Sequence, residues 1–221
     1  MLRKNLVFGF IATALFVGAS TAAQARIPDA AGDFLGTYIG AQGGDLDVLE
    51  AEVLFDGTDF TLTTTLAGAV GTTPNGFYVW GFDRGGATLN PAPFASIGID
   101  NVFFNSVVIL RPDTTVTVNR IGGGGTTNFG AGTAIITGNT ISARIAATEL
   151  PSTGFAPGSY TWNLWPRLAG GTATNISDFA PNNSNAAVVA VPEANSALLF
   201  APAFLAGLGL VVIRRRNTKV A

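Results

Sequence analysis

The chain has 221 residues, with 12 Lys and Arg, 14 Asp and Glu, and neither His nor Cys. The lack of His and Cys excludes triads built on a His base, Cys nucleophiles and most zinc or iron sites. The stretch from Arg26 to Asp178 has six Arg, thirteen acids and no Lys, a net charge of −7, which argues against a nucleic-acid partner.

The N-terminal residues have the three parts of a secretory signal peptide. Arg3 and Lys4 form a charged start, an apolar run covers 6–19, and Ala23-Gln24-Ala25 is a small-x-small cleavage site. The apolar run is shorter than the ~20 residues that span a bilayer. We therefore predict that signal peptidase removes residues 1–25 and that the chain from Arg26 onward is exported. An uncleaved anchor is the alternative.

An acidic segment follows the expected cleavage site. Calcium takes ~6–8 hard oxygen ligands, often carboxylates and loop carbonyls. The segment matches neither an EF-hand loop nor the nonapeptide calcium repeat, so two interpretations stay open, a structural calcium site and solvated surface charge. The candidate calcium ligands are Asp29, Asp33, Asp45, Asp47, Asp56 and Asp59.

A pair of carboxylates is also the machinery of glycosidases. Asp45, Asp47, Glu50 and Glu52 are the candidates for such an acid–base pair. A surface-exposed acidic strand end would contain the same residues, and nothing in the sequence identifies an acid with a raised pKa. We therefore expect the chain not to be an enzyme.

The middle of the chain favours strands, because β-branched and aromatic residues are punctuated by Gly, Asn, Asp and Pro. The clearest strand is 60–66, and Asp56-Gly57 before it indicates a hairpin with 51–55. Further strands are expected at 76–82, 102–110, 114–120, 133–137, 140–147 and 159–166. About eight short strands predict an all-β domain over 26–170, an antiparallel β-sandwich or jelly roll.

Two of these strands are rich in aromatic residues. Alternation places Tyr78 and Trp80 on one face of their strand, and Tyr160 and Trp162 on one face of theirs. Exposed rings of this kind would stack on sugars, whereas buried rings would pack between the sheets. The four residues are therefore candidates both for a glycan-binding platform and for the core.

The C-terminal part of the chain changes character twice. Residues 171–190 are polar and Asn-rich, and we predict a linker there. Residues 197–213 contain no charge and precede Arg214, Arg215 and Arg216, which predicts a transmembrane helix of about 25 Å with a cytoplasmic C-terminus. A buried core helix is the alternative.

The segment 191–221 resembles the PEP-CTERM sorting signal. Val191, Pro192, Glu193 and Ala194 stand before the apolar segment and the basic tail, in the order that this family shows. The resemblance implies processing by an exosortase-like transpeptidase, with Pro192 and Glu193 as recognition residues and the arginines as a retention tail. Ala194 replaces the family's usual second Pro, and without processing the helix would remain as a simple membrane anchor.

These features lead to two leading hypotheses. The first is an exported, non-catalytic surface or matrix protein that is sorted to the envelope as a membrane-anchored precursor, with exopolysaccharide as a partner. Its mature domain would be periplasmic, at the cell surface or extracellular. The second is a glycan- or calcium-binding module at the same location.

Overall fold

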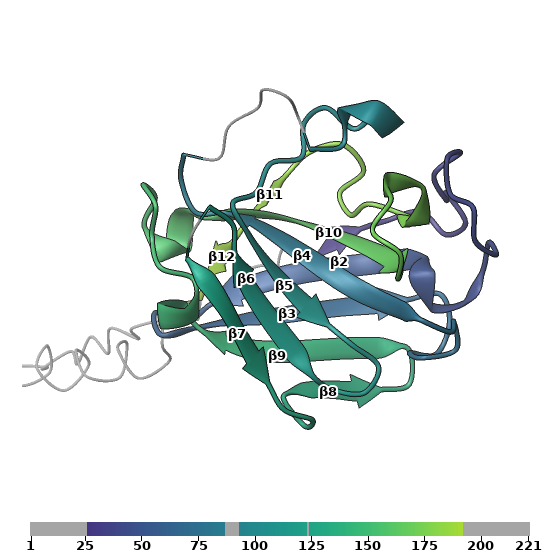
Figure 1. Cartoon of the computed structure of the whole chain (residues 1–221). Coiled ribbons are helices and arrows are strands. Elements are labelled where there is room, and N and C mark those ends of the chain that lie inside the picture. The colour runs from purple at the N-terminus through teal and green to yellow at the C-terminus, as the bar shows by residue number, and fades with distance from the viewer. Residues whose placement is uncertain (1–25, 87–92, 123, 192–221) are drawn as a thin grey trace, which may run out of the picture.

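The computed structural model describes residues 26–86, 93–122 and 124–191 (Figure 1). These residues form two sheets that contain twelve strands and no α-helix, so the all-β prediction is confirmed. The predicted signal peptide, Pro192 to Ala194, the helix over 197–213 and the three arginines lie outside the described residues.

The first sheet has six strands around the hairpin predicted from Asp56-Gly57. Its order is β1 (Ile27–Pro28), β2 (Val48–Phe55), β3 (Asp59–Leu66), β9 (Thr140–Ala146) and β8 (Ala134–Thr137), and β12 (Val189–Ala190) pairs with β2. β3 shows strict alternation of half-buried and buried residues, as its Thr and apolar pattern predicts.

The second sheet also has six strands. Its order is β11 (Ala186–Ala187), β10 (Thr161–Leu168), β4 (Gly76–Asp83), β5 (Ser106–Leu110), β6 (Val116–Arg120) and β7 (Gly125–Phe129). The sequence did not predict β7, whose Gly, Thr and Asn residues show no alternation of apolar and polar positions. The strand expected at 102–110 is shorter than predicted and starts at Ser106.

The two ends of the described chain meet at one edge of the first sheet. β1 pairs antiparallel with β2 at Ala51 and Glu50, whereas β12 pairs parallel with β2 at Leu54 and Phe55. The amide of Val191 continues this pairing, with a hydrogen bond of 2.8 Å to the carbonyl of Phe55. The two short strands therefore cover consecutive halves of an edge that would otherwise be open.

The main core lies between the sheets and takes residues from both. Trp80 and Trp162 lie with ring centroids 5.1 Å apart, and Phe60 stacks on Tyr160 at 5.5 Å. These rings and Tyr78 are fully buried. Burial confirms the core interpretation of the aromatic strands.

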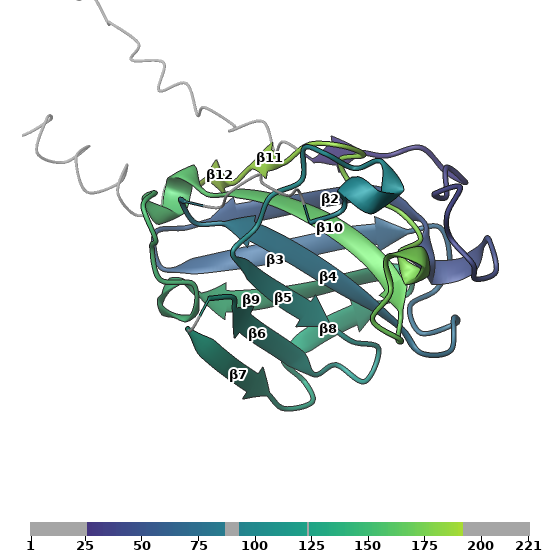
Figure 2. The same cartoon turned by 45° about the horizontal axis from the view of Figure 1, so that its top comes forward.

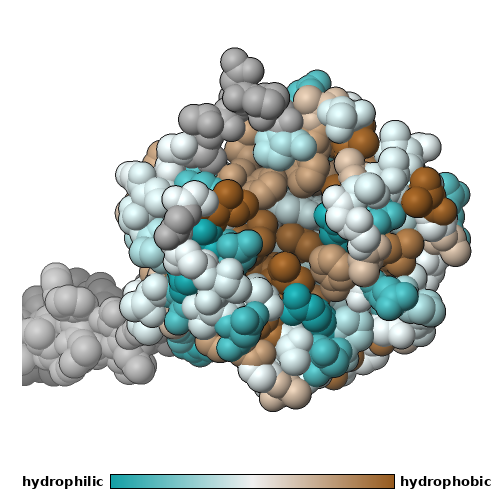
Figure 3. Space-filling model, viewed as in Figure 1, coloured by the Kyte–Doolittle hydropathy of each residue, from teal (hydrophilic) through white to brown (hydrophobic). Residues whose placement is uncertain are grey.

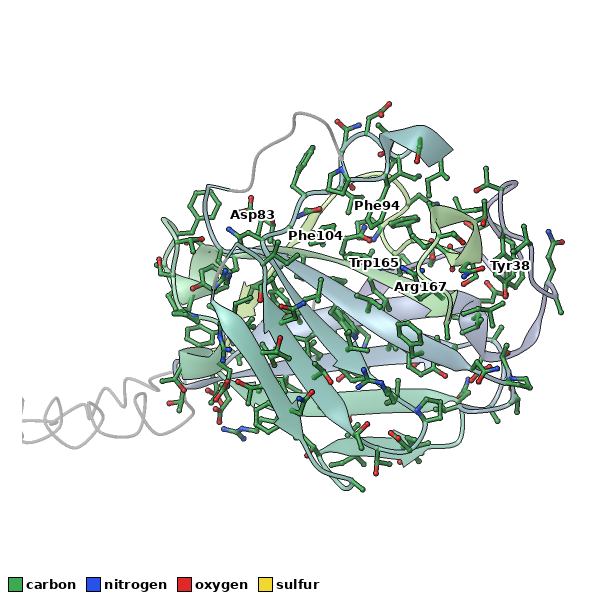
Figure 4. All side chains as sticks on the ribbon, viewed as in Figure 1. Tyr38, Asp83, Phe94, Phe104, Trp165 and Arg167 are labelled. Atoms are coloured by element: carbon green, nitrogen blue, oxygen red, sulfur yellow. The ribbon has the colours of Figure 1, made fainter. Side chains whose placement is uncertain are left out.

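A second hydrophobic cluster covers part of the outer face of the second sheet. Trp165 on β10 packs against Phe94, Phe104 and Phe179, with ring centroids 4.8–6.1 Å away. Figure 4 shows Phe94, Phe104 and Trp165 side by side above the strands. Figure 3 views this face and shows hydrophobic residues gathered toward its middle, with hydrophilic residues around them.

Residues 171–190, predicted as a linker, are instead part of the packed domain. Ile176 and Phe179 are fully buried in the second cluster, and Val188 belongs to the main core. The Asn residues that suggested a linker hold the segment in place. For example, Asn185 Nδ2 donates to the carbonyl of Phe103 at 2.7 Å. Figure 2 shows β11 and β12 lying along the top of the two sheets.

Candidate metal centre

Four aspartates from three distant parts of the chain meet beside the start of β2. Asp29 directly follows β1, and Asp33 ends the turn after it. Asp47 immediately precedes β2, and Asp178 belongs to the C-terminal segment that crosses the same edge. Side-chain oxygens of Asp29, Asp33 and Asp178 all lie within 4.8 Å of one another.

Asp178 is held in this position by backbone groups. Its Oδ2 accepts a hydrogen bond from the amide of Val48 at 2.9 Å, and its Oδ1 accepts one from the amide of Phe179 at 2.7 Å. Next to it, Ser177 Oγ donates to the carbonyl of Leu46 at 2.6 Å. The C-terminal segment is thus fastened to the start of β2, and it presents a fully buried carboxylate there.

Asp47 joins the cluster through the turn at 29–33. The amide of Gly32, which has a left-handed φ of 80°, donates to Asp47 Oδ2 at 2.9 Å. Asp47 is 4% exposed, and its Oδ1 is buried without a hydrogen-bond partner. Asp29 Oδ2 and Asp33 Oδ1 are also buried and unpaired. Three carboxylates of the cluster therefore have a buried oxygen without a protein donor among the described residues.

The cluster concentrates negative charge without a basic side chain. No ion pair within the described part of the chain includes any of the four aspartates. Burial, followed by repulsion from Asp29 and Asp33, raises the pKa of Asp178 to about 8. Burial and then the charge of Asp33 raise the pKa of Asp29 to about 7. Burial also raises the pKa of Asp47.

This arrangement suits a hard divalent cation. Unpaired buried charge is costly unless a counter-charge is present, and calcium takes its ligands from carboxylate oxygens in irregular geometry. Asp29, Asp33 and Asp178 would supply direct ligands, and Asp47 would bind the ion directly or hold the turn. Without a cation, the raised pKa values mean that the cluster retains protons near neutral pH.

Three of the six aspartates predicted as calcium ligands lie elsewhere. Asp45 accepts hydrogen bonds from Tyr78 Oη and from loop amides, and Asp56 and Asp59 pair with Arg144 on the surface. Asp45, Asp56 and Asp59 are close in the sequence, but the hairpin of β2 and β3 separates them. Asp45 precedes β2, whereas Asp56 and Asp59 lie at the turn at its other end. Of the six candidates, the structure therefore brings only Asp29, Asp33 and Asp47 together, beside Asp178.

Asp178 was missed because no other acid stands near it in the sequence. It is the lone carboxylate in the Asn- and Ser-rich segment 171–190. A single acid in a segment of small and amide residues is a feature that sequence inspection could have selected. Its contact with the start of β2 joins residues 130 positions apart, so only the fold shows it.

The other predicted sites are not assembled as the sequence suggested. Tyr78, Trp80, Tyr160 and Trp162 are fully buried, so they cannot form an exposed sugar-stacking platform. Among the candidates for a catalytic pair, Glu50 and Glu52 face Arg26, at 2.7 Å and 3.7 Å, away from Asp45 and its loop.

The described residues contain no helix that is long and apolar enough to cross a membrane. Comparison with protein-family models, curated proteins and solved structures finds no match to this chain in any of the three.

Proposed function

We propose that this chain is an exported, non-catalytic module of the cell envelope, with a β-sandwich of jelly-roll type that a calcium ion fastens. The observation that carries the calcium part is the convergence of Asp29, Asp33 and Asp178 within 4.8 Å, with buried oxygens left unpaired. The ligands come from both ends of the domain, so the ion would join those ends.

The proposed location in the cell envelope rests on the two ends of the sequence. The signal peptide over 1–25 would direct export, and the PEP-CTERM-like segment would place the precursor in the membrane with its C-terminus in the cytoplasm. Signal peptidase, an exosortase-like transpeptidase and the exopolysaccharide of the matrix would be the partners. A structural or matrix role fits a chain without His or Cys better than catalysis does.

The calcium proposal is tested by thermal melting of the full chain in detergent, with calcium, with magnesium and with chelator. Extracellular modules bind calcium at ~10⁻⁴–10⁻³ M. Calcium at ~100 times the dissociation constant adds ~2.7 kcal/mol, which raises the midpoint by roughly 5–10 °C for a domain of this size. Magnesium should give a much smaller shift, since it needs a small octahedral site.

Two matched variants assign that shift to the cluster. Asp178→Asn removes a ligand charge and should abolish the calcium effect. Asp59→Asn changes an aspartate that lies outside the cluster, and should preserve it. An unchanged midpoint at ~100 mM calcium, about 100 times the weakest dissociation constant expected, or an equal response of both variants, would disprove the proposal.

The address is tested separately, in cells. Glu193→Ala should leave the chain as a larger membrane-bound precursor if an exosortase-like enzyme processes it. If the wild type and Glu193→Ala have the same size and both stay in the membrane fraction, the segment is a simple anchor.

A further inference from the structure

A second site, which shares no residue with the carboxylate cluster, lies where two turns meet at one end of the second sheet. A groove of about 460 Å³ is lined by the loop that leads into β4, by the turn between β5 and β6 and by Ala169. Figure 1 shows both turns at the same end of the sheets. The volume falls within the ~300–1,000 Å³ that is typical of small-molecule sites.

One wall of the groove is organised by the buried Asp45. Its Oδ2 accepts hydrogen bonds from the amide of Gly71 at 2.5 Å and from Tyr78 Oη at 2.6 Å, and its Oδ1 accepts one from the amide of Thr73 at 2.8 Å. Gly71 also touches the opposite wall, because a Cβ there would lie 3.2 Å from Pro112 Cβ. A single carboxylate thus fixes the loop, and Gly71 allows the two walls to meet.

The turn that supplies the opposite wall contains a strained residue, Thr114, next to the lining residue Asp113. Among the described non-glycine residues, only Asn75 and Thr114 have a positive φ, of 62° and 64°, and each belongs to one of the two turns. A β-branched residue in this conformation is an outlier that costs ~1–3 kcal/mol. Thr114 is kept there by the amide of Gly132, which donates to Thr114 Oγ1 at 2.8 Å, and by the amide of Ala134, which donates to its carbonyl at 3.0 Å.

The strained turn leaves polar groups available beside the groove. Asp113 Oδ1 accepts hydrogen bonds from the amide of Thr115 at 3.0 Å and from its hydroxyl at 2.6 Å, and the Asp113 side chain is exposed beside the groove. The Asn75 side chain makes no hydrogen bond to any residue that the structure describes. Arg111 uses one nitrogen, Nη1, to donate to Thr117 Oγ1. A carboxylate, an amide and a guanidinium group therefore line one groove with unused hydrogen-bonding capacity.

An aromatic ring completes the lining. Phe77 is half-buried, and the guanidinium carbon of Arg167 lies 5.9 Å from its ring centroid. Arg167 is held by the carbonyl groups of Leu168 and Thr172. Figure 4 shows Arg167 farther along β10 than Trp165. This contact fixes the position of the Phe77 ring beside the groove.

The lining selects one class of ligand. Planar polar side chains beside an aromatic ring match a sugar, whose vicinal hydroxyls accept and donate while its C–H face packs on the ring. Arg111 and Asp113 balance each other's charge, which disfavours phosphates and uronic acids, and a lining that mixes polar and apolar groups suits a ligand with both hydroxyl groups and a C–H face. We propose that this groove binds a neutral oligosaccharide, and that Asp45 and Thr114 preorganise its walls.

The experiment is isothermal titration calorimetry of the full chain in a detergent without a sugar headgroup, which would otherwise compete. The probes are the neutral hexasaccharides of glucose, mannose and xylose, and the hexamer of galacturonic acid. At least one neutral hexasaccharide should bind, and more tightly than the galacturonate hexamer. This result requires neither calcium nor the sorting signal, so its failure would leave the proposed function standing, and the reverse is also true.

Variants assign the binding to the groove. Asp113→Asn retains an oxygen for Thr115 but loses the charge, and Asn75→Gly retains the backbone conformation but loses the amide. Each should weaken binding by about tenfold while the protein still melts cooperatively as a folded domain. Asp100→Asn, the same change on an exposed loop elsewhere, should have no effect. Phe77→Leu keeps the apolar packing and should weaken binding through loss of the ring.

Three outcomes would overturn the proposal. They are the absence of binding by all three neutral hexasaccharides, unchanged affinity in both Asp113→Asn and Asn75→Gly, and tighter binding of the galacturonate hexamer than of any neutral one.

Discussion

At the residue scale, the chain uses its buried and half-buried aspartates in two opposite ways. Both carboxylate oxygens of Asp45 accept hydrogen bonds, whereas Asp29, Asp33 and Asp47 each have one buried oxygen without a hydrogen-bond partner. Burial opposes the ionisation of Asp45, but the hydrogen bonds from Thr73, Tyr78 and Gly71 outweigh it and hold its pKa below the ordinary value. The first arrangement stabilises the ionised carboxylate in the folded protein, whereas the second leaves carboxylate oxygens without a donor.

Replacing Asp45 should therefore unfold the protein more easily. Asp45→Ala leaves the Tyr78 hydroxyl and two amides without their acceptor, and each such loss costs ~1–3 kcal/mol. We expect a loss of roughly 3 kcal/mol or more in the free energy of unfolding, measured by urea denaturation. Asp45→Asn preserves an acceptor and should lose less. A loss no larger than that of exposed Asp100→Ala, within ~0.5 kcal/mol, would contradict this role.

The carboxylate cluster predicts an unusual pH dependence in chelator. The pKa values of Asp29 and Asp178, about 7 and about 8, exceed those of the unfolded chain, so the folded state binds more protons in between. The stability that these protons contribute is complete below the unfolded pKa of ~3.9, and it is lost as the pH rises through the folded values.

Urea denaturation from pH 5 to pH 9 in chelator should thus show stability falling with pH. Asp178→Asn should flatten the decline, and calcium should remove it, because the ion replaces the protons. A flat or rising profile for the wild type in chelator would show that burial and mutual repulsion do not raise the pKa values of these carboxyl groups in the folded protein.

At the element scale, the outer face of β4 has a glycine, Gly81, where the ring of Trp165 packs against the strand. Gly81 faces Trp165, and a Cβ added there would lie 2.5 Å from the indole ring and 3.0 Å from Phe104 Cβ. Elsewhere in a strand, alanine in place of glycine would lower the entropy of the unfolded chain and stabilise the protein. At this position the ring has to move.

Gly81→Ala should therefore destabilise the protein by ~1–3 kcal/mol through overpacking of the second cluster. Gly158→Ala is the matched control, since a Cβ there would find ordinary contacts of 3.6 Å and more. The midpoints of urea denaturation compare the two variants. Equal midpoints would mean that the second cluster is loosely packed.

The sequence predicted the strands correctly where the local alternation of apolar and polar residues was strong. Alternation in β3 and the Asp56-Gly57 turn predicted the first hairpin, because one face of a strand must be buried. β7 lies at an exposed edge and contains Thr and Asn, so its sequence shows no such alternation. Its strand conformation depends on its pairing with β6.

At the scale of the whole molecule, the calcium clasp would join the two ends of the domain. Asp29 and Asp33 flank the N-terminal turn, and Asp178 belongs to the C-terminal segment that leads to β12. β1 and β12 also share one edge of β2. If the ion holds both segments, its removal should loosen both together.

Hydrogen exchange measured by mass spectrometry tests this coupling. In chelator, amides of 27–35 and 176–190 should exchange faster by the same factor, while those of β3 and β9 stay protected. Asp178→Asn in calcium should reproduce the chelator pattern, and Asp59→Asn should match the wild type. Faster exchange at one end alone would disprove the clasp.

The sequence by itself determined the all-β fold class and led to the expectation of an envelope location from the two chain ends, because both depend on short-range pattern. It left open whether the aromatic strands face the core or the solvent, and their burial was decided by the packing of the sheets. Only the tertiary structure decided the members of the two candidate sites. Asp178 and Asp29 stand far apart in the sequence, as do Asn75 and Asp113, and a contact between such residues depends on how strands pair and loops fold back. The sequence identifies the aspartates and the aromatic residues as candidates, but the pairing and packing of the sheets decide which of them are buried and which of their polar atoms have a hydrogen-bond partner.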